Sequence, residues 1–321
     1  MQAFKISERA VACLLSFLGA FVSILTKSVP LLSQTSEIIP GTIYKLYSKL
    51  GLQKDTFTRY VVCSDCSTLF KYSQCVPQRG QNCLTRTCTT IKYPNHPHNT
   101  KRRACGSTLA SVVTYNHGER RFHPHKVYCY KSVIDSLKQF FARPGFYQMC
   151  QQWKKRTYIP GFYRDIYDGK IWRDFQELDG LPFLSGECNL GFMLNIDWFQ
   201  PFKFSPYSVG ALYISVMNLP RKERFKLENI MLVALLPGPH EPDADGLCNY
   251  IKPLVDELLQ LWEHGFEVIV RKGDNSQTLN VRGALLCIAA DLPAARKLCG
   301  FLGHAAKLGC SKCTKQFKTG K

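Results

Sequence analysis

Two aspartates, each at the end of an apolar run, constrain the fold of this chain more than any other feature. Asp197 follows the run of residues 190–196, and Asp291 follows the run of residues 281–290. Both runs have the length and apolar character of buried strands. The sequence therefore predicts two strands that each end in a carboxylate.

The segments between the two aspartates predict a defined strand order. Two more strand-like runs, residues 209–217 and 230–236, precede an amphipathic helix at residues 250–264. Three strands joined by short links pair as an antiparallel meander, and the helix then crosses over to a fourth strand parallel to the first. Asp197 and Asp291 would then lie side by side.

This order predicts an α/β protein with an RNase H-like core. In such a core, strand-end carboxylates hold two Mg²⁺ or Mn²⁺ ions that promote phosphodiester transfer. For either aspartate alone, a polar strand end or a helix cap is the better explanation, and Asp291 before Leu292-Pro293 suits an N-cap; the pair in this strand order is what favours catalysis. No third acid falls in this pattern, so we expect it beyond Lys321, in a core that is C-terminally truncated.

Six of the fifteen cysteines lie within 43 residues and predict a small zinc module. Cys63 and Cys66 form a Cys-x-x-Cys knuckle suited to tetrahedral zinc, and Cys88 and Cys105 are the first choice for its partners. The competing ligands are Cys75, Cys83, His96 and His98. The alternative is a set of free thiols, but a turn-rich module of this size has little core without a metal.

A second pair, Cys310 and Cys313, has the same spacing and predicts half of a zinc site. The total of fifteen cysteines is odd, and those outside the module are scattered through apolar runs. This distribution is typical of a reduced intracellular protein.

Positive charge is concentrated in one segment. The chain has a net charge of +18, and residues 101–173 hold fifteen Lys and Arg against four acidic residues. Aromatic side chains are interleaved with these charges: Trp153, Tyr158, Phe162, Tyr163 and Tyr167. Basic groups neutralise phosphates and aromatic rings stack on bases, so we favour nucleic-acid binding over a merely solvated surface.

The N-terminal apolar run, residues 10–25, spans 16 residues and is shorter than the ~20 that a membrane helix needs. Its spacing suits a core helix better than a secretory signal, and we expect no membrane partner. The expected organisation has four parts: an N-terminal helical region (1–55), a Cys/His zinc-binding module (56–110), a basic helical DNA-contacting segment (111–185) and the incomplete RNase H-like core (186–321).

Within residues 190–313, several stretches resemble the CACTA (En/Spm) class of DNA transposases. They are LGFMLNIDWFQPF, YSVGALYISVMNLPRKERFKLENIMLVALLPGP, IKPLVDELLQLWEHG, VRGALLCIAADLPAARKLCGFLGH and CSKC. Asp291-Leu-Pro-Ala matches the family's Asp-Phe-Pro-Ala element, whereas Trp198 replaces the glycine that usually follows the first aspartate.

The resemblance implies that Asp197 and Asp291 are the first two acids of a DDE/D triad for cut-and-paste DNA transposition. It also implies a nuclear transposable-element protein that binds transposon ends and can form a homo-oligomer. A catalytically inactive, transposon-derived zinc- and DNA-binding protein is the alternative.

Overall fold

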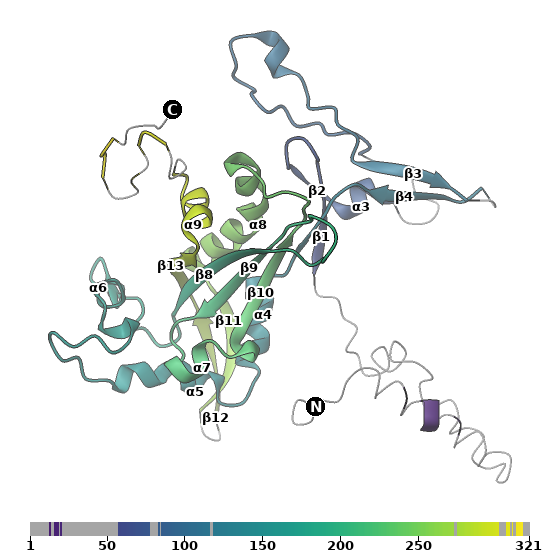
Figure 1. Ribbon diagram of the computed structural model, residues 1–321. Coiled ribbons are helices and arrows are strands. Elements are labelled where there is room, and N and C mark those ends of the chain that lie inside the picture. Colours follow the sequence, from purple (N-terminus) through teal and green to yellow (C-terminus); the bar gives the residue numbers. More distant parts are fainter. Residues whose placement is uncertain are drawn as a thin grey trace, which may run out of the picture. The chain divides into compact units, whose positions relative to one another are not determined.

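Strand β8, Leu190–Phe199, carries Asp197 and is the second strand from one edge of the seven-stranded main sheet (Figure 1). In this computed structural model, β8 pairs antiparallel with β9, Val209–Val216, which in turn pairs antiparallel with β10, Ile230–Leu236. On its other side β8 pairs parallel with β13, Gly283–Ala290. The expected meander and the parallel fourth strand are therefore present in a mixed α/β fold.

The structure describes most of the chain from residue 57 onward. The described residues are 13, 16–18, 20, 57–77, 83, 85–115, 118–272, 275–301, 306–308, 310 and 313–316. The expected helical region at 1–55, with its apolar run, lies almost wholly outside them, in a unit (1–56) separate from residues 57–321. No helix among the described residues is long and apolar enough to cross a membrane.

Three further strands extend the sheet beyond β10. These are β5 (Val127–Tyr130), β1 (Thr58–Val62) and β2 (Leu69–Lys71), which complete the order β13-β8-β9-β10-β5-β1-β2. The sequence pattern predicted that the basic segment, residues 111–185, is helical, but Val127–Tyr130 within it alternate between half-buried and buried positions and form a strand instead. Strands from the cysteine-rich and basic segments thus join the same sheet as the carboxylate strands.

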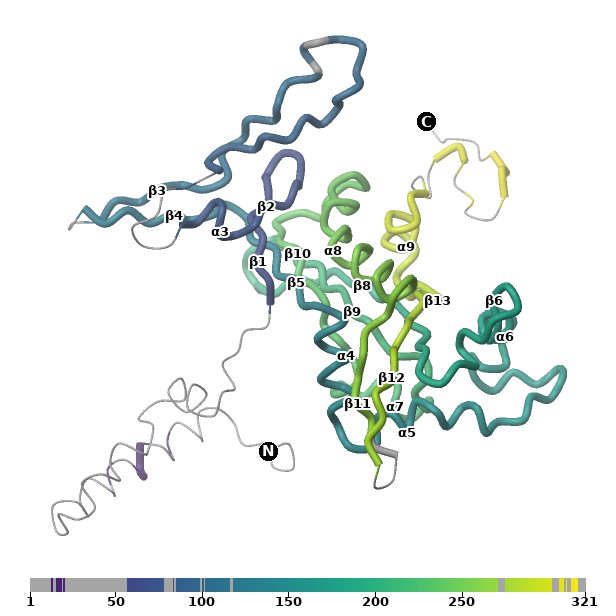
Figure 2. The backbone as a smooth tube through the Cα atoms, turned by 180° about the vertical axis from the view of Figure 1, so that it is seen from behind, coloured from purple at the N-terminus to yellow at the C-terminus, as the bar shows by residue number. Residues whose placement is uncertain are grey.

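Two helices cover one face of the sheet, as Figure 2 shows from behind. Helix α4, Val133–Phe141, starts after Ser132, whose hydroxyl accepts the N–H of Asp135 at 3.1 Å. Helix α8, Ala244–Glu263, starts six residues earlier than its apolar pattern indicated, because Asp243 caps it through the N–H of Gly246 at 2.7 Å. Their apolar sides pack on the main core together with alternate residues of β8.

A hairpin that the sequence pattern did not reveal lies between α8 and β13. Its strands are β11, Phe266–Lys272, and β12, Asn275–Val281. Val268 and Val281 are buried in the main core, so the hairpin covers the same face as α4 and α8. The expected fourth strand began at residue 281, which instead ends β12.

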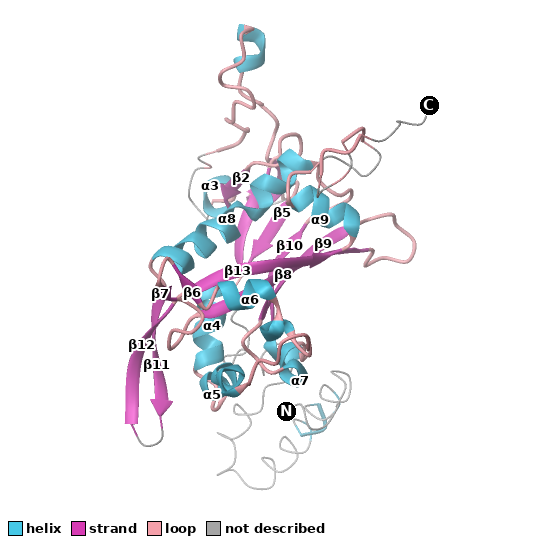
Figure 3. Ribbon diagram, turned by 90° about the vertical axis from the view of Figure 1, so that its left-hand side faces the viewer, coloured by secondary structure: helices cyan, strands magenta, loops and turns pink. Residues whose placement is uncertain are grey.

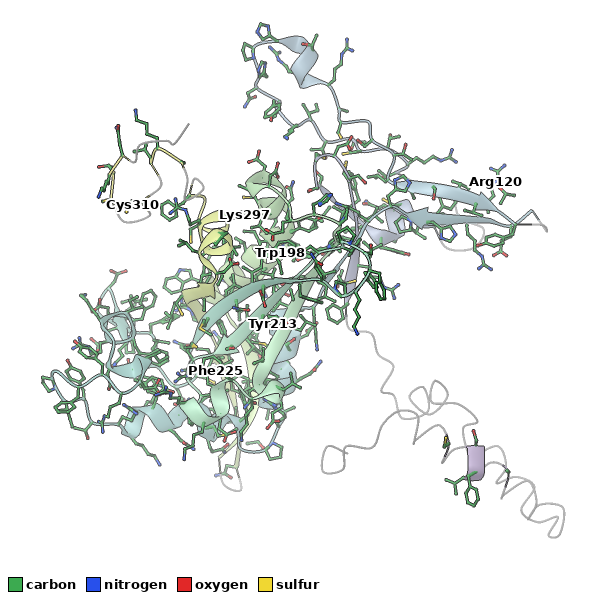
Figure 4. All side chains as sticks on the ribbon, in the orientation of Figure 1. Arg120, Trp198, Tyr213, Phe225, Lys297 and Cys310 are labelled. Atoms are coloured by element: carbon green, nitrogen blue, oxygen red, sulfur yellow. The ribbon has the colours of Figure 1, made fainter. Side chains whose placement is uncertain are left out.

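The remaining elements are short. They are α3 (Tyr72–Cys75), η2 (Asn99–Arg102), β3 (Ala110–Thr114), β4 (Arg120–Pro124), α5 (Phe146–Gln151), η3 (Gln152–Lys155), η4 (Ile166–Asp168), α6 (Lys170–Asp174), β6 (Glu177–Leu178), β7 (Leu181–Pro182), α7 (Arg221–Arg224), η5 (Leu227–Asn229) and α9 (Leu292–Leu298). The hairpin of β3 and β4 projects from the body of the fold, with Arg120 near its tip (Figure 4).

A second, smaller core packs on the opposite face of the sheet, beside α6 (Figure 3). We call it the tryptophan layer: Trp153, Tyr167, Trp172, Phe183, Leu184, Met217 and Ala284. A Cβ atom at Gly191 of β8 would lie 3.0 Å from Cζ3 of Trp172, so this close approach requires glycine. Trp153 and Tyr167 are buried here, which corrects the expectation that they present stacking surfaces to nucleic acid.

One carboxylate ties α8 to the elements beneath it. The Oε2 atom of Glu257 accepts one hydrogen bond from the Tyr130 hydroxyl at 2.8 Å and another from the Val133 backbone N–H at 2.6 Å. Burial raises the pKa of Tyr130, so its hydroxyl remains a donor. The same oxygen therefore satisfies both the sheet residue and the first turn of α4.

We predict that Glu257→Ala lowers the free energy of unfolding by about 1–3 kcal/mol, because two partly buried donors lose their acceptor. Urea denaturation measures the change. Asp256→Ala is the matched control: this neighbour forms only an exposed pair with Lys252, and its loss changes stability by less than about 1 kcal/mol. Equal effects of the two substitutions would contradict the role of Glu257.

Candidate metal centres

Four cysteines converge in the module at the β1 end of the sheet. The Sγ atoms of Cys63, Cys66, Cys88 and Cys105 all lie within 4.8 Å of one another. Within the described residues, this is the one group of three or more His, Cys, Asp or Glu side chains placed to share a metal ion. The structure thus brings together the four first-choice ligands.

Two backbone turns hold the four thiols in place. After β1, the N–H of Cys63 donates to Thr68 and the N–H of Ser67 donates back to Cys63, each at 3.0 Å. The other two thiols lie on facing segments, where the N–H of Cys88 donates to the carbonyl of Ser107 at 2.8 Å. Ser107 also donates through its hydroxyl to the Asp65 carboxylate, which joins the two turns.

The cluster is tied to the main body of the fold by Asn249. Its side-chain N–H donates to the carbonyl oxygen of Cys66 at 3.0 Å from helix α8. Sequence reasoning missed this residue, because its partner lies 183 positions away and no local pattern marks such a contact.

The donor set fits a tetrahedral metal ion. The Sγ atoms are separated by 3.7 Å for Cys63 and Cys105, and by 3.5 Å for Cys66 and Cys88. Zn–S bonds of ~2.3 Å place tetrahedral sulfurs about 3.8 Å apart, whereas a disulfide requires ~2.05 Å. The four-cysteine cluster could therefore hold a metal ion, and it is compatible with structural zinc.

The local electrostatics make metal binding dependent on pH. Burial raises the pKa of Cys63, and it raises the pKa of Cys88 to about 12. Hydrogen bonds from Ser107 lower the pKa of Cys105 to about 7. The first two thiols hold their protons at neutral pH, so a bound cation has to displace them, and affinity falls as the pH falls.

The competing ligands lie outside the four-cysteine cluster. Cys75 is buried in the small core around it, and the thiol of Cys83 donates to the Cys75 carbonyl at 3.3 Å. The His96 and His98 rings contact each other, with centroids 5.5 Å apart. Near the C-terminus (Figure 4), the Sγ atoms of Cys310 and Cys313 are 3.4 Å apart, and the half-site remains a prediction.

Asp197 and Asp291 occupy neighbouring positions at one end of the β8–β13 pair. The sequence pattern ended the first strand at residue 196, but β8 continues to Phe199, so Asp197 lies within the strand, whereas Asp291 directly follows β13. Ile196 pairs with Ala290 in the parallel ladder, so each aspartate is the next residue along its own strand. Adjacent strands lie about 4.8 Å apart. Both aspartates are exposed, and the parallel register brings them to the same edge of the sheet.

Each carboxylate uses one oxygen in a local hydrogen bond. Oδ1 of Asp197 accepts the N–H of Trp198 at 2.9 Å, and Oδ1 of Asp291 accepts the N–H of Ala294 at 2.8 Å as the N-cap of α9. The Oδ2 atoms have no hydrogen-bond partner among the described residues. Hard oxygen donors remain available at both aspartates, as a divalent cation such as Mg²⁺ requires.

Trp198 follows Asp197 on β8 and packs against the neighbouring strand β9 (Figure 4). Its ring lies over Gly210 of β9, where an added Cβ would approach Cζ3 to 2.7 Å. Within the described part of the chain, no third His, Cys, Asp or Glu forms a ligand cluster with the two carboxylates.

Comparison with known families points to one class of protein. Residues 161–320 match the family model described as Transposase family tnp2. The matched segment contains both strand-end aspartates and the strands that carry them, and it begins after the four-cysteine cluster. This match supports a transposase-derived protein. No curated protein matches the chain.

We predict that Cys88→Ala abolishes binding of one zinc ion per chain, because three thiolates remain where four are needed. Elemental analysis of the purified protein measures the stoichiometry. Cys75→Ala is the matched control, since Cys75 is equally buried in the same small core but lies outside the cluster. Zinc retained by the first variant, or lost by the control, would contradict the assignment.

Proposed function

We propose that this protein is a DDE/D transposase of the CACTA class, acting in cut-and-paste transposition through two-metal phosphodiester chemistry. The observation that carries the proposal is the parallel register of β8 and β13, which sets Asp197 beside Asp291. Both acids fall within the segment that matches the tnp2 transposase family.

The proposal includes an RNase H-like core. Strands β10, β9, β8 and β13 are consecutive in the sheet, and the first three are antiparallel. Helix α8 lies on the crossover from β10 to β13. The β11–β12 hairpin and the strands beyond β10 are additions to that plan.

Asp197 and Asp291 would hold Mg²⁺ or Mn²⁺ through their carboxylate oxygens. The ions, when bound, supply activation of the attacking oxygen and stabilisation of the leaving oxygen. The four-cysteine cluster would hold a structural zinc ion that stabilises its module. The two kinds of site differ in donor chemistry, because hard oxygens select Mg²⁺ or Mn²⁺ and thiolates select zinc.

DNA is the proposed partner, and the nucleus is the corresponding compartment. Among the basic segment's aromatic residues, Tyr158, Phe162 and Tyr163 are exposed at 39, 63 and 70% and remain able to stack on bases. The projecting β3–β4 hairpin carries exposed Arg120 and Arg121. A homo-oligomer that pairs two DNA ends is part of the proposal.

We predict that Asp197→Asn and Asp291→Asn each weaken Mn²⁺ binding at least tenfold and abolish Mn²⁺-dependent DNA cleavage, while DNA retention is unchanged. Asparagine keeps the side-chain shape and still caps a helix, so α9 is preserved at Asp291. Calorimetric Mn²⁺ titration and plasmid nicking measure the two effects.

The matched control is Asp256→Asn, which removes an exposed carboxylate from α8 on the other face of the sheet. It should leave both Mn²⁺ affinity and cleavage unchanged. If Asp197→Asn leaves both quantities at the unsubstituted level, the catalytic assignment is wrong.

A second candidate function is a transposon-derived protein that binds zinc and DNA without catalysis. The observation that favours it is the pair of carboxylates without a third ligand among the described residues. DNA retention with no metal-dependent cleavage, together with one zinc ion per chain, would support this alternative.

For both candidate functions, we predict that the logarithm of the DNA association constant falls linearly with the logarithm of the salt concentration, because bound Lys and Arg release counterions from the phosphates. A contact with six phosphates gives a slope of about −5. Fluorescence anisotropy of a labelled duplex between 50 and 200 mM salt measures it. An affinity independent of salt would contradict DNA binding by the basic segment.

A further inference from the structure

A pocket with a volume of about 320 Å³ borders the tryptophan layer. Three of its lining side chains are cationic, namely Lys154, Arg156 and Arg173. The acidic residue in the lining is Asp168, so positive charge exceeds negative charge around this cavity.

The negative charge of Asp168 is already compensated within the protein. Its Oδ2 atom accepts Arg156 at 3.0 Å and the backbone N–H groups of Arg164 and Asp165 at 2.7 and 3.0 Å. Although burial acts to raise the pKa of Asp168, these hydrogen bonds outweigh it and the pKa is lowered. Lys154 and Arg173 therefore face the pocket without a carboxylate partner among the described residues.

Two buried donors at the pocket have no acceptor. Nε1 of Trp153 and Nε of Arg173 are shielded from solvent, and neither has a hydrogen-bond partner in the described structure. Trp153 is only 7% exposed. Nε1 of Trp172 and Nε of Arg143 are unpartnered as well, but only Trp153 and Arg173 line this pocket, where a small shift of their side chains would offer both N–H groups to an acceptor that enters it.

The remaining lining favours a compact anion over a nucleobase. The guanidinium of Arg173 lies 4.5 Å from the centroid of the Tyr158 ring and covers one of its faces. A planar Arg fork beside a lysine suits the oxygens of a phosphate group.

We propose that this pocket binds a phosphate group of the DNA backbone, at a position remote from the two carboxylates. The inference rests on the proposed function for the identity of the DNA, but its phosphate chemistry rests on the pocket alone. Nothing in the catalytic assignment uses these residues.

The tryptophan layer beside the pocket lies on the same face of the sheet as Asp197. Met193 of β8 packs against this layer, and Asp197 follows it at an interval of four residues, so both belong to the same face of the strand. Gly191, which contacts Trp172 of the layer, precedes Asp197 by six residues, or ~20 Å along the strand.

A neighbouring pocket of about 470 Å³ shares Trp153 and Arg156 with the first. It adds Arg221 and Lys222 from α7, together with Asp165 and Glu223, whose carboxylates pair with Arg224 and Lys226. The basic lining thus continues from the phosphate pocket, as a backbone with successive phosphates requires.

The first test uses inorganic phosphate and does not depend on DNA or on cleavage. In ¹⁵N-labelled protein, the indole N–H signal of Trp153, identified by its loss in Trp153→Phe, should shift on phosphate addition. The signals of Trp198 and Trp262 should stay in place, and sodium chloride at equal ionic strength should shift none of the three. An unmoved Trp153 signal at saturating phosphate would overturn the proposal.

The second test links the pocket to DNA. Arg173→Gln should weaken duplex binding about tenfold, as expected when a hydrogen bond to a charged group is lost, and reduce the logarithmic salt slope by about 0.9. Arg173→Lys keeps the charge and should retain most of that slope. Lys252→Gln is the matched control, because it removes one exposed charge from α8 on the opposite face.

The outcomes separate this inference from the proposed function. One outcome is that phosphate addition shifts the Trp153 indole N–H signal while the Arg173→Gln variant binds DNA as tightly as the Lys252→Gln variant. That result would show that the pocket binds phosphate from a source other than DNA. If both tests succeed while Asp197→Asn leaves cleavage unchanged, the phosphate anchor stands and the catalytic assignment fails.

Discussion

The parallel pairing of β13 with β8 is the constraint on which the rest of this structure depends. A parallel pair requires a crossover, which here includes α8 and the β11–β12 hairpin, and those elements supply much of the main core. The amide of Asn195 donates to the carbonyl of Ala289, which helps to fix the register. A slip by one residue would exchange buried and exposed side chains and separate the two aspartates.

The four-cysteine cluster and the sheet are structurally continuous. Cys63 directly follows β1, which pairs with β5 and connects through it to the carboxylate strands. Asn249 adds a contact from α8 to the knuckle. Metal binding at the thiols would therefore stabilise one edge of the same sheet whose other edge carries Asp291, and folding and metal binding would be coupled.

Where sequence patterns mislead in this protein, the reason is tertiary. Residues 127–130 continue the apolar spacing of α4, yet β1 and β10 lie on either side of them and provide hydrogen-bond partners for a strand. Trp153 and Tyr167 lie among basic residues in the sequence, but their rings pack against Trp172 at centroid distances of 5.0 and 4.9 Å. The amino-acid composition around Trp153 and Tyr167 does not show that Gly191 of β8 leaves space for Trp172, the ring on which both of them pack.

Periodicity and spacing in the sequence predicted the local features, namely the apolar strands that carry the two aspartates, the order of the main strands and crossover helix, and the cysteine knuckle. Each depends on periodicity or spacing over a few residues, which the chain displays directly. Three features became visible only in the folded chain: which of the candidate thiols meet, where the β11–β12 hairpin inserts, and that Trp153 and Arg173 leave donors unpartnered at one pocket. Those features depend on contacts between residues far apart in the chain, and their geometry is fixed when the sheet and its two faces pack.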